Sequence, residues 1–482
     1  MEDLTKFAVE TAASSGASYA DARAVDRRSE RARVKNGSVE ALSDGRSHGL
    51  GVRVLADGAW GFAGCAEHST SAVEKAARRA VELARAAASS LSEPVSLAAA
   101  EPVVDSAATE VEIDPDDVSL EDRLALLMEC DRLMRAEGVE IAASFVSVLH
   151  SSKHFSSSEG ASIYQERVET GGGLEATAVG DCGACRRSYP SSHGGQVMTR
   201  GWELIDEIDL PSHAGRIAAE ARQLVDAPTC PCGKRDLILG GGQLALQLHE
   251  SCGHPIELDR VLGTEASFAG TSFLTPDRLG SFRYGSDVVN ITADATLPGG
   301  LGSFAWDDEG VPAQRSWIVR SGIFTGYLTS RETAAQLGFE HSNGCMRADG
   351  WARMPLIRMT NINLEPGELS REAIIESTER GILMEDNLSW SIDDRRLNFQ
   401  FGCEVGWLIE DGEIVGMVRR PSYTGITPEF WRSCDAVADE ETWRVWGVPN
   451  CGKGEPGQTA RVGHGVSAAR FRDVQVGVTG DE

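Results

Sequence analysis

The segment Leu248–His254, with the sequence Leu-His-Glu-Ser-Cys-Gly-His, brings two imidazoles and one carboxylate close together in the chain. Imidazole nitrogens are good ligands for Zn²⁺, and a carboxylate beside the first histidine is placed to take a proton from water that the metal activates. We therefore expect His249 and His254 to bind zinc and Glu250 to serve as the general base of a hydrolase.

The spacing of these two histidines is unusual for a helical metal site. They stand five residues apart, and on a regular α-helix that step separates two side chains by roughly 140°. One tetrahedral ion cannot bridge that angle. Gly253 and Pro255 flank the second histidine, and both residue types disfavour an undisturbed helix. We predict that the helix widens by a π-turn or breaks near Gly253, so that His254 turns back toward His249.

A third ligand is needed, and Cys451 is the first candidate. It lies in the glycine-rich segment Asn450–Gln458. Thiolate is a strong zinc ligand, and Lys453 nearby is expected to favour deprotonation of the thiol. The same segment nearly spells a phosphate-binding loop, but Gly454 stands where Ser or Thr should bind Mg²⁺. The nucleotide-binding interpretation therefore fails.

Other cysteines and histidines compete for the same role. The cysteines that could form a four-thiolate zinc site or a redox pair are Cys182, Cys185, Cys230 and Cys232. The Cys-x-Cys spacing is too tight for a typical zinc knuckle, and no suitable helix follows the first pair, so we interpret them as incidental thiols. His341 and His464 are candidates for a group behind the metal or for an oxyanion-stabilising group.

The elements that must position these residues indicate an α+β fold. A chain of 482 residues is expected to form two or three domains. Patterning predicts an N-terminal α+β lobe over residues 1–100, with a hairpin turn at 56–58, and a middle α+β lobe over 101–226. Ser119 fits a helix cap in that second lobe. Residues 227–482 are predicted to form a β-rich C-terminal domain carrying one catalytic helix.

Composition excludes several partners. The formal net charge of -27 argues against binding to nucleic acid or to an anionic membrane. No apolar run approaches the ~20 residues that cross a bilayer, and the N-terminus lacks the pattern of a secretory signal. We expect a cytoplasmic protein, in which the eleven cysteines are reduced thiols rather than a disulfide framework.

Several segments of the chain, in the same order, resemble the TldD/PmbA family of metallopeptidases from about residue 15 to about residue 475. The segments that carry the resemblance are 49–63, 248–259, 307–312, 346–349, 421–425 and 451–453. The resemblance implies that His249, His254 and Cys451 are the ligands of one Zn²⁺ per chain and that Glu250 is the base. Inactive paralogues in the family have lost these residues, so this chain is similar to the catalytic TldD-like type.

The same resemblance implies a zinc-dependent peptidase that hydrolyses unfolded or small peptides. The family forms homodimers, or heterodimers with a paralogue, that enclose the active site in a cavity. We expect peptides to bind by strand addition, because the C-terminal domain is β-rich. Three alternatives stay open: a zinc amidase maturing a peptide-like natural product, a cysteine hydrolase with Cys451 as nucleophile, and a non-enzymatic peptide-binding subunit. The intact Glu250 counts against the last.

Overall fold

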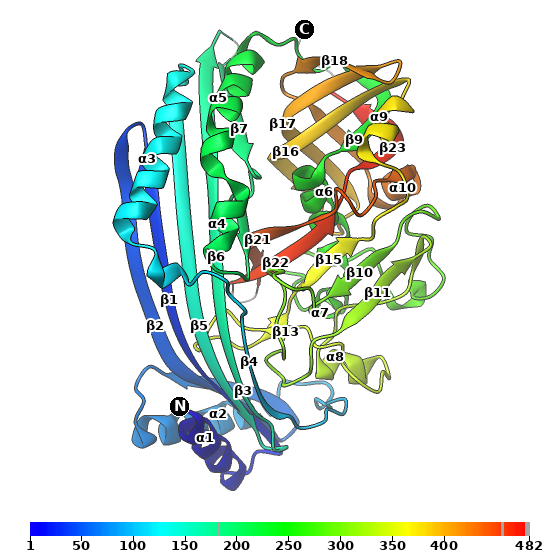
Figure 1. Cartoon of the computed structure of the whole chain (residues 1–482). Helices are drawn as coiled ribbons and strands as arrows, with labels where there is room; N and C mark the ends of the chain where they lie inside the picture. Colours follow the sequence, from blue (N-terminus) through cyan, green and yellow to red (C-terminus); the bar gives the residue numbers. More distant parts are fainter. Residues whose placement is uncertain (182, 455–456, 478–482) are drawn as a thin grey trace.

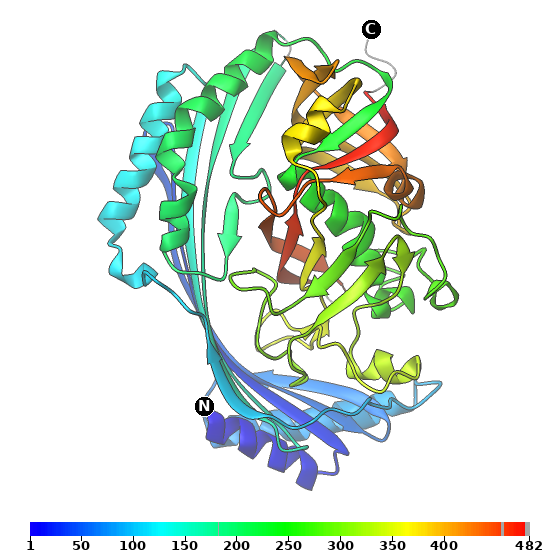
Figure 2. The ribbon, with the colours of Figure 1, turned by 45° about the vertical axis from the view of Figure 1, so that its right-hand side comes forward.

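A long, strongly curved sheet organises the first half of the chain (Figures 1 and 2). The computed structural model describes residues 1–181, 183–454 and 457–477. Within these residues the sheet has the strand order β3-β2-β1-β5-β6-β4, and β7 and β8 also pair with β6. Its strands are β1 (Tyr19–Lys35), β2 (Ser38–Ala56), β3 (Ala59–Cys65), β4 (Val104–Ala108), β5 (Ile141–Ser157), β6 (Ser162–Gly180), β7 (Gly183–Tyr189) and β8 (Gln196–Met198).

Two groups of helices cover one face of this sheet, and the C-terminal half lies against the other face (Figure 2). The helices are α1 (Glu2–Ser14), α2 (Thr70–Ala88), η1 (Pro115–Asp117), α3 (Leu120–Ala136), α4 (Glu203–Ile208) and α5 (Leu210–Asp226). Helices α1 and α2 pack on one end of the sheet, and α3 and α5 pack on the other. The sheet thus takes strands from both residue ranges 1–100 and 101–226.

Local chemistry explains how these elements begin and how closely they pack. The side chain of Ser119 accepts a hydrogen bond from the backbone of Asp122 at the start of α3, as the sequence predicts. The β2–β3 turn at Asp57 and Gly58 has positive φ at both residues, which confirms the predicted hairpin. Helix α2 presents a row of alanines to β3. At Gly61 a Cβ atom would lie 2.0 Å from the carbonyl oxygen of Ala80, so the helix can approach this closely only over glycine.

The C-terminal half is β-rich and contains the predicted inserted helix. Its strands are β9 (Gly233–Leu239), β10 (Ile291–Asp294), β11 (Arg315–Arg320), β12 (Ile323–Phe324), β13 (Met346–Arg347), β14 (Leu356–Ile357), β15 (Asn361–Leu364), β16 (Arg380–Ile392), β17 (Asn398–Glu410), β18 (Glu413–Val418), β19 (Ser422–Ile426), β20 (Cys434–Val437), β21 (Arg444–Lys453), β22 (Gln458–Val466) and β23 (Ala469–Val476). Its helices are α6 (Gly241–Leu248), η2 (His249–Gly253), η3 (His254–Ile256), α7 (Leu258–Val261), η4 (Pro276–Arg278), α8 (Arg331–Gln336), α9 (Arg371–Glu376) and α10 (Thr427–Arg432).

Two sheets of this half share one large apolar core with α6. The first has the order β12-β11-β10-β15-β22-β21, and the second has the order β16-β9-β23-β19-β17-β18 with β20 beside β23. The predicted α+β class with a β-rich C-terminal region is confirmed. None of the helices in the described ranges combines the length and the apolar character that a bilayer crossing requires.

Buried ion pairs join the curved sheet to the C-terminal half. Arg53 on β2 contacts Asp21 on β1 at 2.6 Å and Glu309 in the C-terminal half at 3.1 Å. Asp308 beside it contacts both Arg23 and Lys153 on the sheet. Charges buried in this way are costly when unpaired, so the pairs fix how the two halves dock.

Replacing Arg53 with Met is expected to lower the free energy of unfolding by about 3–5 kcal/mol, because Asp21 and Glu309 then stay buried without their cation. Arg46→Met is the matched control, since Arg46 lies on an exposed part of β2. Thermal unfolding of both variants measures the difference. Equal melting temperatures for the two variants would contradict the interpretation of a docking ion pair.

Candidate metal centre

A π-turn connects the two histidines. Helix α6 ends at Leu248, a π-helix covers His249–Gly253, and a 3₁₀ turn begins at His254. The wider turn offsets the five-residue step and brings the second imidazole back toward the first. The predicted distortion of the helix is confirmed. The indole of Trp431 donates a hydrogen bond to the hydroxyl of Ser251 at 2.9 Å, which anchors the middle of the turn.

Gly253 serves this turn through close packing. Its φ of -56° is ordinary for any residue. A Cβ at this position would instead lie 2.3 Å from the sulfur of Met359, which is fully buried. The glycine therefore lets the π-turn lie against the strand region that leads into β15.

Three candidate ligands converge from two distant parts of the chain. One ligand atom each of His249, His254 and Cys451 lies within 4.8 Å of the other two, and all three residues are buried. The Cys451 sulfur comes from strand β21 and lies 3.8 Å from Nε2 of His254. The two imidazole rings stand perpendicular with their centroids 4.9 Å apart. The structure thus brings together all three residues that the sequence singled out.

The donor set fits zinc in both chemistry and spacing. Zinc–ligand bonds of about 2.0–2.3 Å in a tetrahedral arrangement place ligand atoms about 3.4–3.6 Å apart. The observed sulfur-to-nitrogen distance is 3.8 Å, which a small movement closes. Two imidazoles and one thiolate also leave one tetrahedral position open, as catalytic zinc sites require.

A hydrogen-bonded chain fixes which nitrogen of His249 faces the other ligands. The carbonyl of Ile362 can only accept, so Nδ1 of His464, 3.2 Å away, carries its hydrogen. Nε2 of His464 is then an acceptor for Nδ1–H of His249, at 2.8 Å. Nε2 of His249 keeps its lone pair for a metal. His464, a candidate from the sequence, therefore orients a ligand, whereas His341 is exposed and faces Ala99.

Glu257 orients the second imidazole in the same way. Nδ1 of His254 donates to its carboxylate at 3.0 Å, which leaves Nε2 free. Burial would raise the pKa of Glu257, but Lys453 and His254 hold it well below its usual range. Lys453 itself lies 2.7 Å from Asp259 and 3.4 Å from Glu257. It therefore acts on these carboxylates, which differs from the expectation that it favours deprotonation of Cys451.

The neighbours of Cys451 support its thiolate. Burial would raise the pKa of this thiol, but His254 and Arg358 outweigh burial and lower it below the ordinary value. Arg358 also donates a hydrogen bond to the Cys451 carbonyl at 2.5 Å. Burial lowers the pKa of His249, which keeps that imidazole neutral. Both shifts favour the protonation state that binds a metal.

Glu250 lies in the same buried centre and pairs with Arg396. Nη1 of Arg396 contacts its carboxylate directly. Burial would raise the pKa of Glu250, but His254, His249 and Arg396 together lower it. Arg396 stands at a positive φ of 63° in the turn between β16 and β17. The carboxylate is therefore ionised and held in place by a cation from a different element.

Arg396, Arg358 and Glu257 contact this centre but are not among the residues expected from the sequence. Glu257 follows His254 by three residues, a spacing that could have suggested contact within one helical turn. The two arginines carry no such signal, because each reaches the centre from a segment about 100 or more residues away.

The competing cysteines form no such centre. Cys182 lies outside the described residues, and Cys185, Cys230 and Cys232 join no candidate metal group among the residues that the structure describes. A second acidic group at Asp114, Asp116 and His150 is largely exposed, and Arg28 pairs with it.

Comparisons with known proteins find metallopeptidases that match most of the chain. The chain matches three family models, described as PmbA/TldA metallopeptidase domain 1, central domain and C-terminal domain, over residues 20–84, 113–225 and 233–478. It is 31% identical over 462 residues to a metalloprotease of Methanothermobacter thermautotrophicus, covering 96% of each chain. It is 23% identical to a zinc metalloprotease TldD homolog of Saccharolobus solfataricus, over 58% of this chain and 60% of that one.

A solved structure shares the fold over the whole chain. TldE from Thermococcus kodakarensis superimposes with a TM-score of 0.74 at 20% identity, covering 99% of this chain and 100% of that chain. At this level of identity the likeness concerns the fold alone.

Removing the imidazole behind His249 tests the orienting chain. His464→Ala is expected to weaken zinc affinity by about 10–100-fold, because His249 loses the partner that sets its tautomer and ring orientation. His341→Ala is the control, since His341 is exposed. Competition with a chromophoric chelator measures both affinities. An unchanged zinc affinity in His464→Ala would contradict the interpretation that His464 orients His249.

Proposed function

We propose that this chain, which belongs to the TldD/PmbA family of metallopeptidases, is a peptidase that uses one zinc ion held by His249, His254 and Cys451. The observation that carries the proposal is the convergence of these three ligands at the π-turn. Nδ1 of His249 bonds to His464 and Nδ1 of His254 bonds to Glu257, so Nε2 of each imidazole remains for the metal.

Glu250 is the general base in this proposal. Bound zinc supplies a Lewis acid that activates water and polarises the peptide carbonyl. The Glu250 carboxylate accepts the proton of the attacking water and returns it to the leaving amine. Its pairing with Arg396 supports this role, because the ionised form is the one that can accept a proton. Burial of the centre keeps bulk water from competing with these contacts.

Peptide substrates are proposed to bind as an added strand. Among the described strands, β21 lies at the end of its sheet with β22 as its partner, and it carries Cys451. Gln196 already bonds to the backbone of Val445 and Gly447 on this strand, so an added peptide strand would lie against the part nearer Cys451. Backbone pairing of this kind suits sequence-tolerant recognition. We further propose that the active unit is a homodimer, or a heterodimer with a TldD/PmbA paralogue, that encloses the site and admits unfolded or small peptides.

Removing the base tests the assigned role. Glu250→Gln is expected to retain zinc and to lose turnover by about 10²–10⁴-fold, because the amide cannot accept the proton. Glu372→Gln, at an exposed position on α9, is the control. Metal content is measured by mass spectrometry, and turnover by the peptides released from a denatured protein. A Glu250→Gln variant of full activity would refute the assignment.

Activity assays on the purified chain test the need for zinc and the composition of the dimer. Loss of activity with a chelator and recovery with zinc would exclude a cysteine hydrolase that uses Cys451 as its nucleophile. Digestion by the chain alone would favour a homodimer, whereas digestion only after adding a paralogue would favour a heterodimer. Stoichiometric zinc without any hydrolysis in either case would overturn the peptidase proposal.

A further inference from the structure

A large cavity lies between the curved sheet and the C-terminal half, along the β21–β22 hairpin. Its volume is about 1100 Å³. One wall is formed by Thr459, Ala460 and Arg461 of β22, and Ala460 pairs in register with Cys451. The cavity therefore borders the same hairpin that supplies a metal ligand.

A second, smaller cavity continues the first along the inner face of the sheet. It has a volume of about 550 Å³ and includes Asn450, the residue before Cys451. The two share Leu149, Glu169, Pro449 and Arg461 in their walls. We call the two together the sheet-facing cleft. Its elongated form suits an extended chain better than a compact metabolite.

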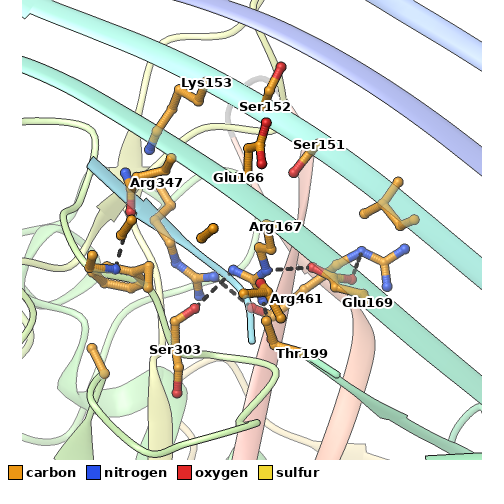
Figure 3. Close-up of a pocket in the computed structure, with 18 of the residues that line it drawn as sticks. Ser151, Ser152, Lys153, Glu166, Arg167, Glu169, Thr199, Ser303, Arg347 and Arg461 are labelled. Carbon is orange, nitrogen blue, oxygen red and sulfur yellow. Dashed lines mark hydrogen bonds and ion pairs between the residues drawn. The ribbon is translucent and has the colours of Figure 1, made fainter. Parts of the chain in front are cut away.

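Three guanidinium groups gather on one wall of the larger cavity, with one carboxylate among them. Figure 3 shows Arg167, Arg347 and Arg461 beside Glu169. Glu169 contacts Arg167 at 2.8 Å and Arg461 at 2.9 Å. Nearby, Asp308 is shared between Lys153 and Arg23. Five cations thus lie close to two carboxylates on this part of the wall, whereas acidic and basic side chains balance over the lining of the cavity as a whole.

Among the described residues Arg347 forms no ion pair with a carboxylate, and Asp308 acts on its charge only from a distance. Its guanidinium donates to the backbone carbonyls of Arg461, at 2.7 Å, and of Met359, and its buried Nε has no hydrogen-bond partner in the described residues. Burial and the neighbouring cations Arg167 and Arg358 lower the pKa of Arg347 to about 9. Like charges held this close are unfavourable unless an anion joins them.

The acidic residues of the cavity do not supply that anion. Glu110, Glu112 and Glu166 also line it, but all three are exposed, and solvent screens their charges. Asp349 is engaged by Arg27 at 3.4 Å. Glu203 is paired with Arg200 at 3.6 Å. The wall around Arg347 therefore keeps a local excess of positive charge, which favours a charge-assisted hydrogen bond to an anion.

We propose that Arg347, with Arg167 and Arg461, binds a carboxylate of the peptide substrate, so that the cleft selects acidic segments or the free C-terminus of a peptide. This proposal rests on the peptidase function proposed above and adds a substrate class to it. Guanidinium groups match the planar carboxylate with paired hydrogen bonds, which point-charge lysines cannot do. The hydroxyls of Ser303 and Thr199 lie on the same wall but already donate to the carbonyls of Leu297 and Gly300, so the arginines are the donors for a ligand (Figure 3).

Direct binding tests the proposal apart from turnover. The protein is the zinc-loaded Glu250→Gln chain, and the probes are fluorescein-labelled Gly/Ala peptides that carry either glutamates or glutamines, each with a free or an amidated C-terminus. Fluorescence anisotropy gives the dissociation constants. The reference is the peptide with glutamines and an amidated C-terminus, which carries no carboxylate. We expect the carboxylate-bearing peptides to bind tighter than this reference by on the order of tenfold, the value of one charge-assisted hydrogen bond. The preference should weaken as salt is added.

Arginine variants locate the effect. Arg347→Met and Arg461→Met in the same background should each abolish the preference. Arg444→Met is the matched control, because its guanidinium also bonds only to backbone carbonyls in the described residues but is exposed, on the same strand as Cys451. Loss of the preference on amidation would identify the chain terminus as the source, and loss on changing Glu to Gln would identify side chains. Both results support the proposal.

Two results would overturn it. One is equal affinity for all four peptides, and the other is a preference that survives in both arginine variants. A Glu250→Gln chain that still hydrolyses the probes, or that lacks zinc, would instead count against the peptidase mechanism. Intact-mass analysis of the probes after each titration separates these cases, because binding is measured whether or not cleavage occurs.

Discussion

The metal centre depends on a single geometric constraint, which is that two imidazoles five residues apart must face the same point. A regular helical turn cannot satisfy it. The π-turn at His249–Gly253 does, and much of the surrounding structure supports that turn. Trp431 holds its middle, and Met359 packs where any side chain at position 253 would lie. A π-bulge is costly in an isolated helix, so tertiary contacts of this kind have to hold it.

Buried charges also shape the structure, and their effect depends on whether a partner of opposite charge lies nearby. At the junction of the two halves, Arg53 and Asp308 have partners of opposite charge and fix the docking. Beneath the metal centre, Lys453 and Glu257 compensate each other and orient His254. In the sheet-facing cleft the compensation is incomplete around Arg347. A buried charge without a partner lowers stability, so it is retained most readily where a ligand of opposite charge binds to it.

The β21–β22 hairpin connects the candidate metal centre with the sheet-facing cleft. Strand β21 carries Cys451 toward the π-turn, and its partner β22 carries His464 behind His249 and Arg461 into the cleft. One hairpin thus supplies a candidate ligand, the group that orients another ligand, and part of the wall of the cavity. Alternation of side chains along the two strands makes this possible, since successive residues point to opposite faces.

The sequence alone indicated the candidate ligands His249 and His254, the candidate base Glu250, the α+β class and the need for a distorted helix between the two histidines. These follow from residue type and spacing, which act over one or two turns of the chain. Even Cys451 depended mainly on family resemblance. The tertiary structure alone decided that Arg396 holds Glu250, that Arg358 rather than Lys453 acts on Cys451, and that Arg347 bonds to backbone carbonyls rather than to a carboxylate among the described residues. Such contacts join segments far apart in the sequence, and only the packing of the sheets brings them together.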